Sequence, residues 1–160
     1  TRIDSSILKL ASDMLETMRE NNGVGLAAPQ IGESIRLIVV EYPENDEIED
    51  SPLISYKLIN PEITWMSEEK TIGVEGCLSF RGLAGEVERA ESVKIRALNI
   101  HGKPFNITAN GWLARIFQHE IDHLDGICYV DRANKVWEMS AEEEEETEQD
   151  ESITNNPPIS

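Results

Sequence analysis

Two histidines four residues apart, with a glutamate directly after the first, form the clearest chemical pattern in this chain. They lie in the run His119-Glu120-Ile121-Asp122-His123, inside a segment with helical periodicity. Residues four apart share one face of a helix, so both imidazoles can bind the same divalent cation. The glutamate between them then lies at the edge of the site, where a carboxylate can move protons to and from a water. The pattern predicts metal-assisted hydrolysis with Glu120 as general acid/base.

A cysteine can supply the third ligand that two histidines lack. It is Cys77, within the segment Glu75-Gly76-Cys77-Leu78-Ser79. A disulfide with Cys128, the second of the two cysteines, is the alternative. No signal-peptide pattern opens the sequence, however, and this favours a reducing compartment in which Cys77 remains available as a thiolate. Two imidazoles and one thiolate leave a fourth position open, which is typical of a catalytic rather than a structural metal site.

Two helices are predicted to position these groups. The histidine motif lies on a predicted helix over residues 112–124, whose other side is apolar at Leu113, Ile116, Phe117 and Leu124. Asp125-Gly126 ends this helix. A second amphipathic helix is predicted over residues 4–20, with an apolar stripe at Ile7, Leu10, Ala11, Met14, Leu15 and Met18. We expect both helices to pack on one core.

Between the helices the sequence predicts a series of strands. The β-branched run 35–41 predicts a buried strand, and residues 56–66 carry a strand signal that Asn60-Pro61 interrupts. Residues 84–89 and 92–98 predict successive strands, and residues 103–108 predict the returning strand after a turn over 99–102. This order predicts an α+β fold, with mixed or antiparallel sheets packed around a central helix that carries the histidine motif.

Length and charge bound the function classes. The chain has 160 residues and a formal net charge of -17, which describes one acidic globular domain. Nine of its carboxylates lie between residues 138 and 160, among them five consecutive glutamates that repel one another. We therefore predict a catalytic domain over 1–134 and an acidic tail over 135–160 that is a frayed helix or disordered. The negative charge argues against nucleic acid as a direct partner, and the apolar runs are too short for a membrane span.

Three segments together resemble the signature motifs of the peptide deformylase family. They are the histidine motif over 119–123, the cysteine segment over 75–79 and the run Gly23-Val24-Gly25-Leu26-Ala27-Ala28-Pro29-Gln30, in the order and at the spacing of the family. Residues 90–104 are also similar to the hairpin of the family, and the similarity covers roughly residues 5–131. The family removes the N-formyl group from the initiator methionine of nascent chains and releases formate. The resemblance implies this activity for the chain.

The resemblance also implies roles for individual residues. The metal ligands that it implies are Cys77, His119 and His123, with Glu120 as general acid/base. The tetrahedral oxyanion formed from a formamide needs hydrogen-bond donors. In the family these donors are a glutamine side-chain amide, here Gln30, and the backbone N–H after the cysteine, here that of Leu78. The resemblance implies one divalent cation, Fe(II) in the cell, and a mixed nitrogen and sulfur site also accepts Zn, Ni or Co.

Backbone groups near the glycines are predicted to bind the peptide. Gly25 lets the backbone approach a ligand closely, and an extended peptide can pair as an added strand with Val24 and Gly76. Trp112 and Ile116 lie one or two turns before His119 on roughly its face of the helix. We expect them to line the pocket for the methionine side chain.

Two arginines receive supporting roles. Arg115 also lies four residues before His119, and it is predicted to be a solvated or rim charge rather than a substrate contact. Arg89 is predicted to pair with Glu75 and so to support the cysteine loop. The family's usual Pro-Gly after Ser79 is replaced by Phe80-Arg81-Gly82, so we expect a loop of different shape there.

The resemblance implies formyl-methionyl nascent peptides at the ribosome as partners of a monomeric enzyme. It implies the cytoplasm of a bacterium or of a virus-infected bacterial host, with an organelle as the alternative location. A metzincin-like peptidase is a competing interpretation, but its pattern expects a third histidine where this chain has Tyr129. A second is a non-catalytic module whose acidic tail binds a basic surface. A structural metal site would need a fourth ligand, and Cys128 is instead predicted to pack as a small apolar residue.

Overall fold

The structure, a computed structural model, describes residues 3–139 of the chain. Its helices are α1 (Ser5–Glu20), α2 (Gly111–Leu124) and α3 (Tyr129–Arg132), with two short 3-10 helices, η1 (Ala28–Ile31) and η2 (Leu78–Phe80). Its strands are β1 (Gly25–Ala27), β2 (Leu37–Pro43), β3 (Leu53–Met66), β4 (Lys70–Glu75), β5 (Leu83–Ala90), β6 (Ser92–Leu98), β7 (Pro104–Asn110) and β8 (Lys135–Glu138). This confirms the predicted α+β class.

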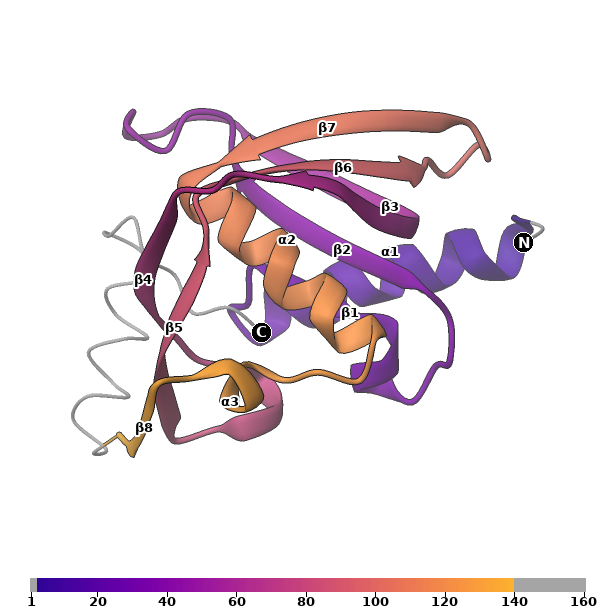
Figure 1. Ribbon diagram of the computed structural model, residues 1–160. Coiled ribbons are helices and arrows are strands. Elements are labelled where there is room, and N and C mark those ends of the chain that lie inside the picture. The colour runs from indigo at the N-terminus through magenta and orange to yellow at the C-terminus, as the bar shows by residue number, and fades with distance from the viewer. Residues whose placement is uncertain (1–2, 140–160) are drawn as a thin grey trace.

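The strands form two sheets on different sides of α2. One sheet has the order β1-β2-β3-β6-β7 and the other the order β4-β5-β8, and all the strand pairs in these sheets are antiparallel. Figure 1 shows α2 running through the middle of the molecule, with β4 and β5 along one side of it and the larger sheet above. The predicted arrangement of sheets around a central helix is therefore confirmed.

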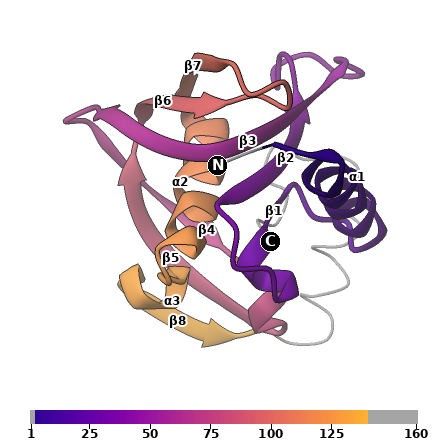
Figure 2. The same cartoon turned by 90° about the vertical axis from the view of Figure 1, so that its right-hand side faces the viewer.

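Helix α1 covers the outer side of β1 and β2, as Figure 2 shows. Asp4 caps the helix, because its carboxylate accepts hydrogen bonds from the backbone N–H groups of Ser6 and Ile7 at 3.0 and 3.2 Å. The predicted apolar stripe is buried at Ile7, Ala11, Met14, Leu15 and Met18, where it forms a core cluster with Leu37 and Val39 of β2. This packing fixes the segment that leads into β1.

Helix α2 is buried on every side over residues 114–123. Its apolar side chains Ile116, Phe117 and Ile121 join the main core beneath the five-stranded sheet. The polar side chains on its other faces need partners, because a buried polar group without one is costly. Gln118 meets this need by exchanging hydrogen bonds with the backbone of Ala90 at 2.9 and 3.1 Å. The helix is thereby tied to β5 one residue before His119.

Several elements differ from the sequence expectations. Strand β3 is continuous where Asn60-Pro61 was expected to interrupt it, because a register shift between Ile59 and Glu62 absorbs the break, with Asn60 at a φ of 51°. The short elements β1, β4 and α3 were not predicted.

The first residues of the predicted tail belong to the folded part. Residues 135–138 form β8, which pairs with β5 from Leu83 to Glu86, so the expectation of a frayed or disordered segment is wrong for these four residues. Lys135 opposite Glu86 gives the added strand a favourable pair across the ladder. The rest of the predicted tail, from residue 140 onward, lies outside the described residues. Within residues 3–139, the helices are too short or too polar to cross a bilayer.

Candidate metal centre

Cys77, His119 and His123 converge in the interior of the molecule. Their ligand atoms all lie within 4.8 Å of one another, and all three residues are buried. His123 Nε2 is 3.2 Å from His119 Nε2 and 3.5 Å from Cys77 Sγ. Donors at ordinary zinc-ligand distances from one tetrahedral ion would be about 3.4–3.6 Å apart. Two of the three donor pairs are therefore near the spacing expected around one divalent cation, and the third pair lies within 4.8 Å.

Glu75 holds the first histidine in place. Its Oε1 lies 2.8 Å from His119 Nδ1, which leaves Nε2 for a metal. Glu75 also accepts two hydrogen bonds from Arg89, both at 2.9 Å, so the predicted pairing of these residues is present. Burial opposes ionisation of Glu75, but its hydrogen bonds with Arg89 and His119 outweigh this and lower its pKa to about 2. The glutamate is thus an ionised anchor for a ligand.

Arg115 is a second buried partner of the same carboxylate. Only 3% of its side chain is exposed, and its Nη1 donates to Glu75 Oε2 at 2.6 Å. The expectation of a solvated or rim charge is therefore wrong. Its position four residues before His119 was the correct signal, since residues at this spacing share a helix face. The sequence could not show that Glu75, forty residues away, would lie against that face.

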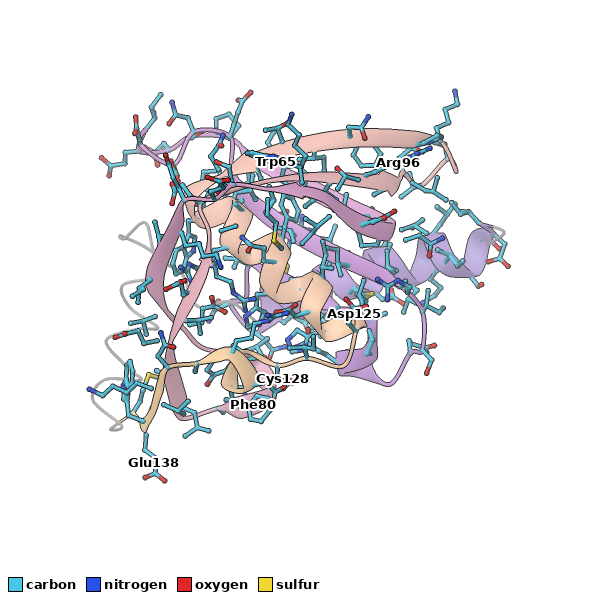
Figure 3. The ribbon with its side chains drawn as sticks, in the orientation of Figure 1. Trp65, Phe80, Arg96, Asp125, Cys128 and Glu138 are labelled. Carbon is cyan, nitrogen blue, oxygen red and sulfur yellow. The ribbon has the colours of Figure 1, made fainter. Side chains whose placement is uncertain are left out.

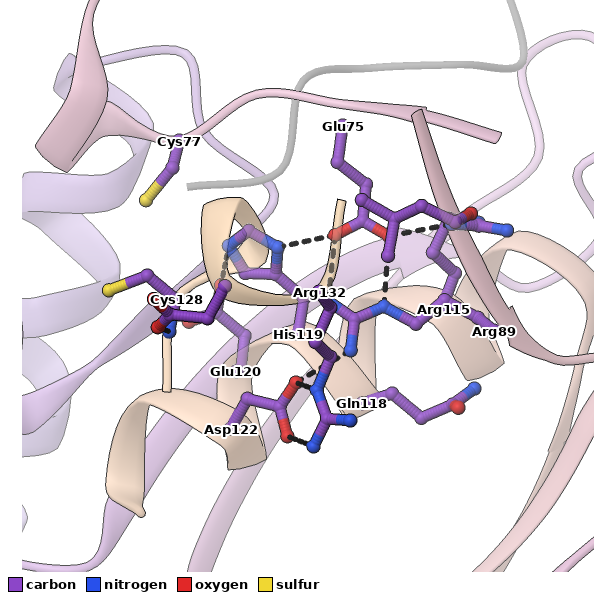
Figure 4. A network of polar contacts seen from close by, with 12 residues as sticks. Glu75, Cys77, Arg89, Arg115, Gln118, His119, Glu120, Asp122, Cys128 and Arg132 are labelled. Atoms are coloured by element: carbon purple, nitrogen blue, oxygen red, sulfur yellow. Dashed lines mark hydrogen bonds and ion pairs between the residues drawn. The ribbon is translucent and has the colours of Figure 1, made fainter. Parts of the chain in front are cut away.

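The polar network extends past Arg89 to two residues that the sequence analysis did not single out (Figure 4). Arg89 Nη1 donates to Asp122 Oδ2 at 2.6 Å, and Arg132 donates to the two oxygens of Asp122 at 2.6 and 3.0 Å. Asp122 lies inside the histidine motif, at one of its variable positions. The network therefore joins α2, β4, β5 and α3 around His119.

Glu120 is fully buried beside the ligands. Its Oε1 is 3.8 Å from His119 Nε2. Its side chain packs over Gly25 of β1, where an added Cβ would be 2.9 Å from Glu120 Cγ and 3.2 Å from Oε1. Gly25 was predicted to let the backbone approach a ligand. In the structure the group that needs this space is the carboxylate of Glu120.

Gln30 reaches the cysteine loop from η1. Its Oε1 accepts the backbone N–H of Ala27 at 2.8 Å, which fixes the orientation of the side-chain amide. Its Nε2 then lies 3.6 Å from Cys77 Sγ and 3.2 Å from the hydroxyl oxygen of Ser79. Leu78 is the first residue of η2, at the helix end where backbone N–H groups lack partners within the helix. Both predicted oxyanion donors thus belong to segments next to the ligand Cys77.

The surroundings of Cys77 favour the neutral thiol over the thiolate. Burial raises the pKa of its thiol to about 12, and the nearby Glu120 carboxylate adds to this effect, although Ser79 hydrogen bonds oppose it. A metal ligand must be a thiolate, so a positive charge beside the sulfur is needed to hold it. Both cysteines are free thiols. Cys128, seen near α3 in Figure 3, is half-buried with its sulfur 4.0 Å from His123 Nδ1, so its surroundings are more polar than predicted.

The predicted peptide-binding residues differ in exposure. Val24 is half-buried, and its carbonyl already accepts the N–H of Glu41 at 2.9 Å. Gly76 directly precedes the ligand Cys77. Trp112 is half-buried, with Arg115 Cζ 5.6 Å from its ring centre. Ile116 is fully buried in the main core, so it lies behind any open pocket beside Trp112.

The loop after the cysteine is closed by aromatic packing. Phe80 contacts Tyr129 edge to face, with ring centres 6.0 Å apart. Arg81 has a φ of -57°, within the range that proline imposes, and Gly82 has a φ of 81°. The unusual sequence Phe80-Arg81-Gly82 is therefore compatible with a backbone that Pro-Gly could also adopt.

Tyr129, where a metzincin would have its third histidine, is not part of the ligand cluster. Its ring stacks on His119 with centres 6.1 Å apart, and Cys77 supplies the third donor instead. The hydroxyl of Tyr129 is buried and has no hydrogen-bond partner among the described residues. Burial raises its pKa to about 12, with the charges of Cys77 and Glu75 contributing. The metzincin interpretation gains no support from this geometry.

An antiparallel α+β fold whose central helix presents two histidines to a cysteine from an adjacent loop is the arrangement of a metal-dependent hydrolase, and the described residues hold one such cluster of candidate ligands. A family model described as polypeptide deformylase matches residues 1–139, and the chain belongs to this family. The resemblance that the three motifs indicated is confirmed.

Individual relatives agree with this assignment. The peptide deformylase of Symbiobacterium thermophilum is 52% identical over 148 residues, 92% of this chain, which spans 65% of that protein's length. The peptide deformylase of Natranaerobius thermophilus is 51% identical over 137 residues, 86% of this chain and 83% of that relative. Among solved structures, a Met-Ala-Ser-bound class I type b peptide deformylase from Acinetobacter baumannii matches with a TM-score of 0.73 and 44% identity, over 81% of this chain and 82% of that chain.

Proposed function

We propose that this chain hydrolyses the N-formyl group of formyl-methionyl peptides and releases formate. The observation that carries the proposal is the convergence of Cys77, His119 and His123 beside the buried carboxylate of Glu120. A structural metal site would not need such a carboxylate, nor a glutamine amide held against the cysteine. Membership of the polypeptide deformylase family supports the same conclusion.

Glu120 is proposed to move the protons of the reaction. A divalent cation held by the three ligands would polarise the formyl carbonyl and make water a better nucleophile. Glu120 accepts a proton from the water as its oxygen attacks the formyl carbon. When the carbon–nitrogen bond breaks, Glu120 delivers a proton to the leaving amine, and formate departs. Its burial against His119 and Gly25 limits the positions that the carboxylate can take.

Gln30 and the backbone N–H of Leu78 are proposed to stabilise the oxyanion. The contact from Ala27 to Gln30 Oε1 turns the amide nitrogen toward the ligand Cys77. A donor fixed in advance in this way needs little rearrangement as negative charge develops. Because its present acceptors are a sulfur at 3.6 Å and the Ser79 hydroxyl at 3.2 Å, the amide can be shared with a substrate oxygen.

The peptide is proposed to lie along β1 as an added strand. Among the described residues, strand β1 is at the edge of the five-stranded sheet and pairs with β2 alone, so its other side has no strand partner there. Gly76 would face the peptide from the other side. Trp112, supported by Arg115 and backed by Ile116, would form a wall of the methionine pocket. The Met-Ala-Ser ligand of the A. baumannii relative is consistent with a substrate of this kind.

The metal in the cell is proposed to be Fe(II), although zinc, nickel or cobalt would suit the same donors. The natural substrates are proposed to be nascent peptides at the ribosome, processed by a monomeric enzyme in a bacterial cytoplasm. Bacterial sources of the relatives support this setting.

Formate release from formyl-Met-Ala-Ser tests the activity directly. The protein is prepared anaerobically with Fe(II), and a chelated sample is assayed beside it. We expect turnover that depends on the metal. One equivalent of bound metal without any turnover would instead favour a non-catalytic module.

Two variants and a matched control test the residue assignments. Glu120→Ala should keep the metal and lose at least about 100-fold in kcat, because only proton transfer is removed. Cys77→Ala should also lose metal affinity. Arg36→Ala removes an exposed pair with Asp125 and should change neither property. Normal turnover by both site variants would show that the assignment is wrong.

A further inference from the structure

We propose that Arg115 is a positioning residue for the metal ligand His119 and that it acts through the carboxylate of Glu75. This inference deepens the proposed function and rests on it for the identity of the bound metal site. The hydrogen bonds of Arg115 go to Glu75, Val87 and Thr71 and not to the candidate ligands. Its contacts instead fix the group that orients one of them.

Glu75 is held to α2 at two points, one helical turn apart. Its Oε2 accepts from Arg115 Nη1 at 2.6 Å, and its Oε1 lies 2.8 Å from His119 Nδ1. Arg89 ties the carboxylate to β5, and it reaches α2 through its own ion pair with Asp122. Among the described residues, Arg115 and His119 are the two α2 side chains that contact this carboxylate directly, and His119 is the group that the carboxylate has to orient. Arg115 is therefore the direct tie, apart from the imidazole itself, between Glu75 and the helix that carries both histidines.

The guanidinium is itself fixed to both neighbouring strands. Arg115 Nη1 donates to the carbonyl of Val87 on β5 at 2.9 Å, and Nη2 donates to the carbonyl of Thr71 on β4 at 2.8 Å. A planar guanidinium with three hydrogen bonds in different directions has little freedom to turn. The ring of Trp112 lies against its other side. Arg115 thus has the rigidity that a positioning residue requires.

Gly73 provides the space for this guanidinium. A Cβ at Gly73 would be 2.9 Å from Arg115 Cζ and 3.0 Å from its Nε. The backbone of Gly73 pairs with Val87 in a regular antiparallel ladder, so its conformation does not demand glycine. Glycine is needed because the guanidinium of Arg115 lies where a Cβ at this position would be. Gly73 and Arg115 are therefore expected to act as one unit.

The test measures metal affinity rather than activity. Co(II) binding by competition with a chelator is compared for the wild type, Arg115→Met, Gly73→Ala and the double variant. Loss of a partner that orients a metal ligand typically weakens metal binding by 10- to 100-fold. We expect about 10-fold for Arg115→Met, because Arg89 still holds Glu75. Arg115→Lys should recover part of the affinity.

The double variant separates positioning from general damage. If Gly73→Ala acts by displacing Arg115, the single variant should weaken Co(II) binding. In a protein that already carries Arg115→Met, the same substitution should cause no further loss of affinity. Phe117→Leu is the control: it disturbs the buried core of α2 without touching Glu75, and it should leave the Co(II) affinity unchanged. The visible absorption of the Co(II)–thiolate unit should shift in the Arg115 variants and not in this control.

Wild-type affinity in Arg115→Met, or multiplicative losses in the double variant, would overturn the proposal. If Arg115→Met does not fold, Arg115→Lys and Gly73→Ala carry the same comparison. Failure of the proposed function is distinguishable. Cobalt-loaded wild type that releases no formate would refute the activity, whereas the order of affinities would still decide the role of Arg115.

Discussion

Replacing Gly25 with alanine should damage catalysis by moving Glu120. The added Cβ would lie 2.9, 3.1 and 3.2 Å from Cγ, Cδ and Oε1 of that side chain. Non-bonded carbon atoms prefer about 3.5–4.0 Å, so the carboxylate has to retreat by about 0.5 Å or more. Both groups are buried, which leaves little room for a smaller adjustment.

The expected loss follows from the role of the carboxylate. General acid/base groups contribute about 10²–10⁴ in rate, and a displacement of about 1 Å can cost about 10²-fold. We expect kcat of Gly25→Ala to fall about 10- to 100-fold, or about 1.4–2.7 kcal/mol in activation free energy. KM should change little, because alanine keeps the backbone groups of β1. Metal content should also be unchanged, because the three atoms nearest to the new methyl group all belong to Glu120 and not to a candidate ligand.

Formate release at varied formyl-Met-Ala-Ser, together with metal analysis of the same samples, measures all three quantities. Gly76→Ala is the comparison variant, since its Cβ would meet only the carbonyl oxygen of Leu83 within 4 Å, at an ordinary 3.7 Å. Its loss in kcat should be at least about tenfold smaller. A kcat for Gly25→Ala within twofold of wild type, or a parallel loss of metal, would refute the reasoning.

Tyr129→Phe should raise the free energy of unfolding by about 1 kcal/mol, because the buried hydroxyl has no partner among the described residues. Urea titration measures this change, and a loss of stability would contradict the expectation. Acid should destabilise the protein through Glu75, whose pKa is about 2 in the folded state against an ordinary value of 4.5. The stabilisation from the ionised form is present above pH 4.5 and is lost as the pH falls toward 2, by about 3 kcal/mol in total. Unfolding midpoints between pH 5 and pH 2 test this, and Glu75→Gln should show a weaker dependence over the same range.

The clustering of the two histidines could be predicted from sequence because the signal for it is local. His119 and His123 need only the helical repeat to share a face, and residues 112–124 carry that repeat clearly. The apolar stripe of α1 is local in the same sense. Family resemblance then linked Cys77 to the two histidines across more than forty residues.

Strand β4 escaped prediction because its pattern is the reverse of the usual one. Its apolar residues Ile72 and Val74 are exposed, at 58% and 53%, whereas Gly73 and Glu75 face the interior. A sequence rule that places apolar residues inside cannot recognise such a strand. The inward-facing residues Gly73 and Glu75 lie against the buried guanidinium of Arg115, and the carbonyl of Thr71 accepts one of its hydrogen bonds. Its contacts are long-range, so neither the strand nor the burial of Arg115 could be derived from local spacing.

Strand β1 is short, and its length limits how many residues of a bound peptide can pair with it. The strand has three residues, Gly25–Ala27, and the last of them already gives its N–H to Gln30. A peptide added at this edge can form a ladder only about as long as the strand. Recognition would thus end within a few residues of the formyl group. Chains that share their first few residues but differ in all that follows would then be processed at similar rates.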